Sequence, residues 1–129
     1  MRTWVLAVVL MVASMGVSRA QDAAAGEAIF KKYICFACHD AGEGAKIKLG
    51  PPLNGLDGKK AGTYPGFSYS DGFVASGITW NADSFKDYIH NPAQKIPGTR
   101  MAFAGIKDDT EIGNLWAYLK QFGADGKKK

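Results

Sequence analysis

Apolar residues near the C-terminal end of the chain recur with the spacing of one helix face. The large apolar side chains of this segment are Ile112, Leu115, Trp116, Leu119 and Phe122. Their three- and four-residue spacing predicts an amphipathic helix. Asp108, with Glu111 three residues later, is a variant of the capping box that opens helices. Gly123 is the predicted C-terminal cap, because glycine accepts the backbone conformation that ends a helix.

Two earlier segments carry the same helical signal. Asp22 can cap a helix over residues 23 to about 33, and Asn81 or Asp83 can start another one. Asn91-Pro92 ends the second helix, since the residue before a proline disfavours helical geometry. The apolar stripes are Ile29, Phe30 and Tyr33 in the first helix and Phe85, Tyr88 and Ile89 in the second.

Turn-forming residues dominate the chain between about 40 and 77. The strongest turn signals are Gly50-Pro51-Pro52, Asn54-Gly55, Asp57-Gly58 and Tyr64-Pro65-Gly66. No internal repeat is present. The pattern therefore predicts an all-α domain with long loops, and loops of this length need a bound group to fill the core they surround.

Residues 1 to 20 have the pattern of an export signal. Arg2 supplies the positive charge, the stretch from 5 to 17 is almost wholly apolar, and Ser18-Arg19-Ala20 places small residues at the cleavage position. An uncleaved membrane anchor is the alternative, but the apolar stretch is short for a bilayer of about 30 Å. We expect cleavage after Ala20, a mature domain over 21–129, and a location in the bacterial periplasm.

Charge excludes a nucleic-acid-binding role. Removing Arg2 and Arg19 leaves 14 basic and 12 acidic residues in 21–129, a net charge of +2. Three of the lysines are the terminal Lys127-Lys128-Lys129, so the rest of the domain is close to neutral. We expect this lysine tail to be a frayed, solvated end.

Cys35-Phe36-Ala37-Cys38-His39 is the segment that carries the chemistry. The C-x-x-C-H pattern is typical of covalent attachment of a c-type haem. Cysteines three residues apart lie on one face of a helical turn, so both can reach the vinyl groups of one haem, and the histidine can become an iron ligand. Haem would then carry the redox chemistry.

Three other interpretations of the two cysteines are weaker. A thioredoxin-like dithiol needs a preceding strand and a βαβ context, which this chain lacks. A structural zinc site needs four ligands, and besides His39 the chain has only His90. A disulfide between Cys35 and Cys38 would close a small, strained loop.

Met101 is the leading candidate for the second axial iron ligand. It is the only methionine beyond residue 20. It follows Ile96-Pro97-Gly98-Thr99-Arg100, an irregular segment in which a thioether suits an iron ligand better than a core filler. Bis-histidine ligation through His90 is the alternative. A six-coordinate haem favours electron transfer over an enzyme or a gas sensor, which would need an open iron position.

With these residues in place, the chain resembles the class I cytochromes c, in particular the soluble bacterial c2-type proteins, and is similar to mitochondrial cytochrome c. The resemblance runs from Gly26 to Gly123. Besides the haem motif, it rests on Gly50-Pro51-Pro52-Leu53, Pro65-Gly66-Phe67-Ser68-Tyr69-Ser70, Gly77-Ile78-Thr79-Trp80, Asn91-Pro92 and the segment 96–106. It implies the small cytochrome c fold, helices and long loops wrapped around one covalent haem c.

The resemblance also implies roles for individual residues. Cys35 and Cys38 would form the thioethers, and His39 and Met101 would bind the iron. The carbonyl of Pro51 would accept the second imidazole N–H of His39. A buried haem propionate would be held by Tyr69, Ser70, Trp80 and Lys59. Tyr88 and Thr99 would lie beside Met101, and Gly26 would let its helix approach Leu115 and Tyr118.

The implied function is one-electron transfer by a monomeric carrier, not catalysis. The partners implied are membrane and periplasmic redox proteins: cytochrome bc1, a terminal oxidase, a photosynthetic reaction centre or a dehydrogenase cytochrome. One residue is inserted before the haem motif, and Ile34 and Ala93-Gln94 replace lysines of the mitochondrial proteins. Lys46, Lys48, Arg100, Lys107 and, less certainly, Lys32 remain around the haem edge. We therefore expect only weak electrostatic steering.

Overall fold

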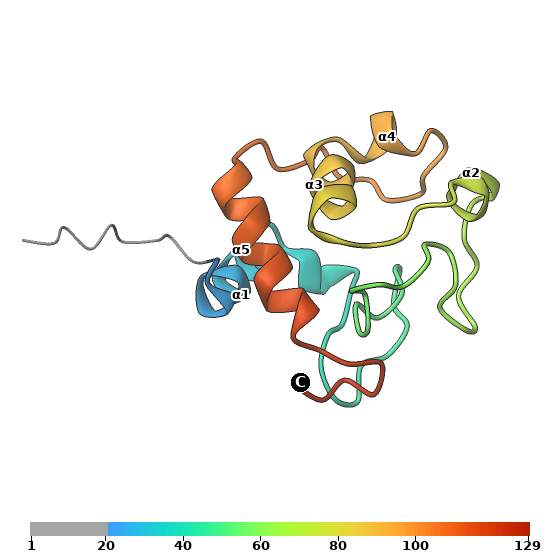
Figure 1. The fold of residues 1–129 in the computed structure, drawn as a ribbon. Coiled ribbons are helices and arrows are strands. Elements are labelled where there is room, and N and C mark those ends of the chain that lie inside the picture. The colour runs from blue at the N-terminus through green and yellow to red at the C-terminus, as the bar shows by residue number, and fades with distance from the viewer. Residues whose placement is uncertain (1–20) are drawn as a thin grey trace, which may run out of the picture.

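The computed structural model describes residues 21–129, so the predicted signal peptide lies outside the described residues. The helices are α1 (Ala23–Lys32), the 3₁₀ turn η1 (Cys35–Ala37), α2 (Asp71–Ala75), α3 (Ala82–His90), α4 (Pro92–Lys95) and α5 (Asp109–Lys120). Long loops connect them (Figure 1). The described part contains isolated bridges but no strand, which confirms the all-α prediction. Over 21–129 no helix has the length and apolar content to cross a membrane.

Helices α1 and α5, from opposite ends of the chain, pack against each other (Figure 1). Gly26 makes the crossing close: a Cβ there would meet the carbonyl of Asn114 and the Cβ of Tyr118. The resemblance implied that Gly26 approaches Leu115 and Tyr118; the approach to Tyr118 is confirmed, and the nearest atoms belong to the Asn114 backbone. The Asn114 side chain also accepts the Asp22 N–H at 3.0 Å. The crossing therefore depends on a residue without a side chain.

Helix α3 packs on the other side of α5, where the ring centroids of Phe85 and Trp116 lie 5.0 Å apart. The start of α3 is fixed by a capping box, in which Asn81 accepts the Ser84 N–H and Ser84 accepts the Asn81 N–H. Asn91 then caps the short helix α4, with Pro92 in its first turn. Asn91-Pro92 thus ends one helix, as predicted, and also begins the next.

The C-terminal end corrects two expectations. Helix α5 ends at Lys120 and its cap is Gln121, in a right-handed conformation, so the predicted Gly123 cap is wrong. The lysine tail is not frayed. The Lys129 N–H donates to the Gln121 carbonyl at 2.8 Å, and the Gly123 N–H donates to the Lys127 carbonyl at 2.9 Å. These backbone bonds fold the tail back along the end of the helix.

The long loop after η1 is held by hydrogen bonds in place of regular secondary structure. The buried Asn54 side chain accepts the Gly42 N–H at 2.8 Å and donates to the Gly42 carbonyl at 2.9 Å. A second part of the loop forms the helix α2, which the turn-rich sequence did not predict; Ser70 caps it by accepting the Phe73 N–H. The loop is therefore ordered by specific contacts.

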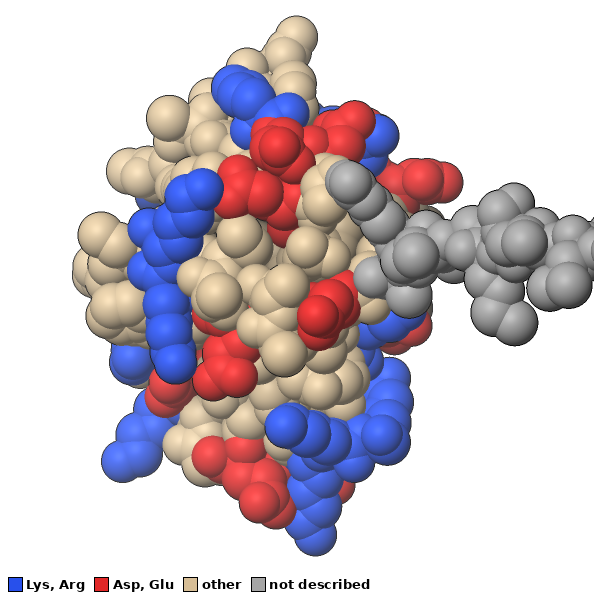
Figure 2. Space-filling model, turned by 90° about the vertical axis from the view of Figure 1, so that its left-hand side faces the viewer, with Lys and Arg blue, Asp and Glu red and all other residues tan. Residues whose placement is uncertain are grey.

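Charges are balanced over the surface. The ion pairs within residues 21–129 are Glu27–Lys31, Lys32–Glu111, Asp40–Lys48, Lys86–Asp109 and Asp87–Lys95. On the face drawn in Figure 2, Lys and Arg are interspersed with Asp and Glu. Such exposed pairs add little stability, about 0–1 kcal/mol each. Their main effect is to weaken the field around the protein.

Candidate functional site

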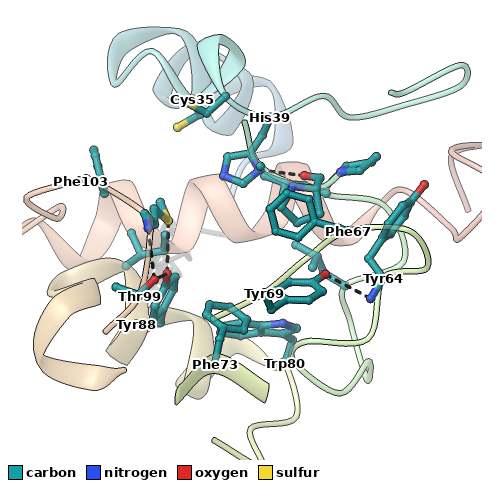
Figure 3. Close-up of a pocket in the computed structure, with 18 of the residues that line it drawn as sticks. Cys35, His39, Tyr64, Phe67, Tyr69, Phe73, Trp80, Tyr88, Thr99 and Phe103 are labelled. Atoms are coloured by element: carbon teal, nitrogen blue, oxygen red, sulfur yellow. Dashed lines mark hydrogen bonds between the residues drawn. The ribbon is translucent and has the colours of Figure 1, made fainter. Parts of the chain in front are cut away.

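A cavity of about 540 Å³ lies between the inner faces of the helices and the long loops. Its walls are mainly apolar and aromatic, and they include residues from every helix except α4. The volume falls within the range of about 300–1,000 Å³ that is typical of ligand and cofactor pockets. The side chains in Figure 3 point into this space from several directions.

The C-x-x-C-H segment forms one wall of the cavity. The turn η1 is closed by the His39 N–H, which donates to the Cys35 carbonyl at 2.9 Å. Cys35, Cys38 and His39 all line the cavity. Both cysteines are free thiols, and burial raises the pKa of Cys35 to about 11. Neither sulfur is committed to a disulfide or a metal cluster, so both remain available for covalent attachment of a ligand.

His39 is oriented by its backbone surroundings. Its Nδ1 lies 2.8 Å from the Pro51 carbonyl. This contact assigns the proton to Nδ1 and leaves the lone pair of Nε2 free. Burial lowers the pKa of His39, which keeps the imidazole neutral. A Cβ at Gly50 would come 2.3 Å from the Cε1 of His39, so this position has to be glycine for the ring to fit.

Met101 and its neighbours form another wall. The Tyr88 hydroxyl donates to the Met101 sulfur at 3.4 Å and shares a 2.9 Å hydrogen bond with the Thr99 hydroxyl. The Met101 N–H donates to the same Thr99 oxygen at 3.3 Å. In Figure 3, Tyr88 and Thr99 lie across the cavity from His39. A thioether and a neutral imidazole are thus presented from two sides of one space.

The alternative ligand His90 lies elsewhere. It is exposed at the end of α3 and is absent from the cavity lining formed by residues 21–129. Its carbonyl accepts a hydrogen bond from the Lys107 ammonium group. The described part of the chain also holds no group of three or more Cys, His, Asp or Glu side chains that could bind a metal ion.

The predicted propionate-binding residues Tyr69, Ser70, Trp80 and Lys59 all line the cavity, but their contacts differ. The Tyr69 hydroxyl accepts the Tyr64 N–H at 3.1 Å, and burial raises the pKa of Tyr69. The Ser70 hydroxyl is occupied as the cap of α2. Trp80 is buried, 7% exposed.

Lys59 brings a cationic side chain to this part of the cavity wall. Its ammonium group lies 4.8 Å from the centre of the Tyr64 ring, and burial lowers its pKa. No ion pair of Lys59 is present among residues 21–129. This end of the cavity therefore offers a positive charge and hydroxyl groups.

Comparison with known proteins identifies the family. The family model described as "Cytochrome c" matches residues 23–123. The chain is 52% identical to cytochrome c2 of Blastochloris viridis over 129 residues, the whole length of both chains. It is 62% identical over 107 residues to cytochrome c-550 of Bradyrhizobium diazoefficiens, covering 83% of this chain and 77% of the relative.

The chain belongs to the cytochrome c family.

A solved structure agrees with this family assignment. Cytochrome cH from Methylobacterium extorquens matches with a TM-score of 0.70 at 41% sequence identity, over 77% of this chain and 97% of that one. The cytochrome c fold predicted from the sequence is therefore confirmed. Members of the family carry covalent haem c, and this chain has the matching pattern in Cys35, Cys38 and His39. It is an electron carrier, not an enzyme.

The cavity fits this cofactor. The walls are apolar, two thiols and an imidazole lie on one of them, and a thioether lies on another. Gly50 leaves room for the imidazole, and Lys59 supplies a positive charge where an anionic group could sit. These are the donor types that hold and ligate a c-type haem.

Sequence reasoning missed several aromatic side chains of the cavity. These are Tyr64, Phe67 and Phe103. Beside them, the ring of Phe73 stacks on Tyr69 with centroids 5.3 Å apart. Phe73 also packs edge-on against Tyr88 at 5.7 Å. For Tyr64 and Phe67, the available signal was the presence of large aromatics within a turn-rich segment, where a solvated loop would not hold them.

Proposed function

We propose that this cytochrome is a one-electron carrier of the bacterial periplasm, with His39 and Met101 as its axial iron ligands. Cys35 and Cys38 would form the two thioether links to the haem. The observation that carries the proposal is the pairing of donors across the cavity. The Pro51 carbonyl occupies Nδ1 of His39 and leaves Nε2 free, while Tyr88 holds the sulfur of Met101 at 3.4 Å.

Haem c supplies reversible one-electron oxidation and reduction of its iron. The protein residues would restrict the haem to electron exchange by excluding other ligands from the iron. With His39 and Met101 on the two axial positions, no position stays open for oxygen or peroxide. A histidine–methionine pair also raises the reduction potential relative to two histidines. Pro51 would fix the orientation and basicity of the imidazole.

The polar end of the cavity would receive the haem propionates. Lys59 and the hydroxyl of Tyr69 offer a positive charge and a hydrogen-bond donor, and burial disfavours the charged form of an unpaired Lys59. A carboxylate beside Lys59 would offset this penalty. Trp80 would add its indole N–H. Ser70 contributes less in this reasoning, since its oxygen already accepts the Phe73 N–H.

Electron exchange would occur where apolar side chains surround the mouth of the cavity. Ile34 and Leu49 line the cavity and are 59% and 81% exposed. Two of the nearby lysines are engaged: Lys32 pairs with Glu111, and Lys48 binds the Phe36 carbonyl at 2.9 Å and lies 3.6 Å from Asp40. We expect brief docking through a small interface with weak steering.

Its partners would be membrane or periplasmic redox proteins of the classes named by the resemblance. Weak steering predicts that the rate of electron transfer to a partner changes by less than about tenfold when salt is raised to screen surface charge. Stopped-flow mixing of the reduced protein with an isolated membrane redox complex would measure this dependence.

Absorption spectroscopy of the purified holoprotein tests the ligand assignment. We expect a weak near-infrared band from methionine sulfur on ferric iron and a reduced spectrum that carbon monoxide leaves unchanged. M101A should abolish the band, allow carbon monoxide to bind and lower the potential. H90A is the matched control, because His90 is exposed and outside the cavity. Loss of the low-spin spectrum in H90A, with M101A unaffected, would establish bis-histidine ligation instead.

A further inference from the structure

A polar cluster joins the end of α1 to the beginning of α5. The Tyr33 hydroxyl donates to one carboxylate oxygen of Glu111 at 2.7 Å, and the Lys32 ammonium group binds the other at 2.7 Å. The Glu111 N–H donates to the Asp108 cap at 3.0 Å. In the predicted capping box, therefore, the bond from the Glu111 N–H to Asp108 forms, but the Glu111 side chain binds elsewhere. Its carboxylate turns toward α1 and fixes the phenol of Tyr33.

The Tyr33 ring continues from this cluster to the loop that carries Met101. It meets Phe103 edge-on, with ring centroids 6.1 Å apart and an interplanar angle of 88°. Phe103 follows Met101 by two residues, and its N–H donates to the Met101 carbonyl at 3.0 Å. Tyr33, Met101 and Phe103 all line the cavity. Contacts thus lead from Glu111 through Tyr33 and Phe103 to Met101.

Arg100, beside Met101, donates to the Ser68 carbonyl at 3.1 Å, and the other anchors of the loop are on the α3 side. Tyr88 holds Thr99 and Met101, and the Ile106 N–H donates to the Ile89 carbonyl at 2.9 Å. Between these two anchors the loop spans 102–105. Tyr33 approaches this span from α1, on the side of the haem motif, so it can hold the part of the loop around Phe103 against the cavity.

An unusual backbone turn at the end of α1 positions Tyr33 beside Phe103. It is the C-terminal cap of α1, and the next residue, Ile34, has a φ of +57°. The Ile34 N–H donates to the Lys31 carbonyl at 3.1 Å, a bond of the helix-ending motif in which glycine normally follows the cap. A β-branched residue is strained in this conformation. Strain of this kind persists only where surrounding contacts over-determine it.

We propose that Tyr33 is a positioning residue that keeps the methionine loop closed over the haem, and that Glu111 orients it for this role. The inference rests on the proposed function, since it takes Met101 as the iron ligand. Tyr33 acts through Phe103, by disfavouring conformations in which the loop moves away and the sixth iron position opens.

Imidazole binding to the ferric holoprotein tests the proposal. Exogenous imidazole reaches the iron only when the loop opens, so its apparent affinity reports the open population. In Y33L, which removes the ring, we expect the affinity to rise by about threefold to tenfold, the range that an aromatic edge contact supports. In Y33F, which keeps the ring and loses the bond to Glu111, we expect a smaller rise of about twofold to threefold.

Y118L is the matched control for Y33L. Tyr118 is also an aromatic residue at the α1–α5 packing, with its ring centroid 5.6 Å from that of Phe30, but it does not line the cavity. We expect Y118L to lower the free energy of unfolding and to leave imidazole affinity unchanged. The methionine band should also disappear at lower temperature in Y33L than in Y118L, relative to the unfolding midpoint of each variant.

Each outcome decides the proposal. If Y33L loses stability like Y118L while its imidazole affinity stays at the wild-type value, Tyr33 has only a structural role and the proposal is wrong. If Y33F equals wild type while Y33L binds more tightly, the part assigned to Glu111 is wrong. A wild-type protein without the methionine band would instead refute the ligand assignment, which the spectrum reveals before any variant is compared.

Discussion

Replacing Gly26 by alanine should disrupt the packing of α1 on α5. The added Cβ would lie 1.9 Å from the Asn114 carbonyl oxygen and 2.7 Å from the Cβ of Tyr118. The first contact is with helix backbone, so a change of side-chain rotamer cannot relieve it. The only remedy is a movement of one helix away from the other.

The size of the effect follows from that movement. An ordinary contact requires a withdrawal of about 1.5 Å, and a gap of about 1 Å already forfeits up to half of the dispersion energy of facing atoms. Overpacking of this kind costs about 1–3 kcal/mol, and more where backbone must move. The higher helix propensity of alanine relative to glycine offsets about 1 kcal/mol of this cost. Because the backbone must move here, the cost lies at or above the upper end of this range, so we expect a net loss of about 2 kcal/mol or more in the free energy of unfolding.

Denaturant unfolding of the holoprotein, followed by far-UV circular dichroism, measures this loss. G113A is the control, because Gly113 is also helical but a Cβ there meets only the flexible Gln21 side chain, at 2.9 Å. G113A should be neutral or stabilising by up to about 1 kcal/mol. A G26A protein as stable as G113A would refute the reasoning, since the helices would then tolerate a side chain at their crossing.

Three further substitutions probe other parts of the site. I34G should raise the free energy of unfolding by about 1 kcal/mol, because glycine is unstrained at a φ of +57°; a loss of stability in denaturant unfolding would contradict this. E111Q should reduce the pH dependence of stability. The hydrogen bonds from Lys32 and Tyr33 lower the pKa of Glu111, so its contribution is present above the unfolded pKa of about 4.3 and is lost as pH falls through the lower folded value. Melting temperatures of E111Q and wild type should therefore converge toward pH 3, and a difference that stays constant would count against the pairing. Y88F removes the donor to the Met101 sulfur, so the sulfur becomes a stronger electron donor that favours ferric iron; the reduction potential should fall in a redox titration, and an unchanged or higher potential would argue against this contact.

The helices at the two ends of the chain could be predicted because their signals are local. Four of the five apolar residues at helical spacing lie in α5, Phe122 follows just after its end, and Asp108 caps the helix as expected. The wrong cap at Gly123 has a non-local cause. Backbone bonds from the folded tail, such as that from Lys129 to Gln121, take over the end of the helix, and no periodicity predicts them.

In the site, too, features with a local sequence signal could be predicted and long-range contacts could not. The C-x-x-C-H motif and the single methionine of the domain could be identified from the sequence because their chemistry requires particular residue types. The contact of Tyr33 with Glu111 could not, because it joins positions 78 apart in the chain. The short helix α2 was missed since glycine and serine surround it, and its order depends on Phe73 packing among other aromatic rings.

The meeting of α1 with α5 has a consequence for cleavage of the chain. A single cut at the exposed Pro65-Gly66 turn would produce one fragment with α1 and the haem motif and another with α3 and α5. The most extensive helix packing within residues 21–129 would then lie between the fragments rather than within either one. Because that packing does not depend on the continuity of the middle loop, a proteolytically nicked protein should migrate as one species under native conditions and separate only in denaturant.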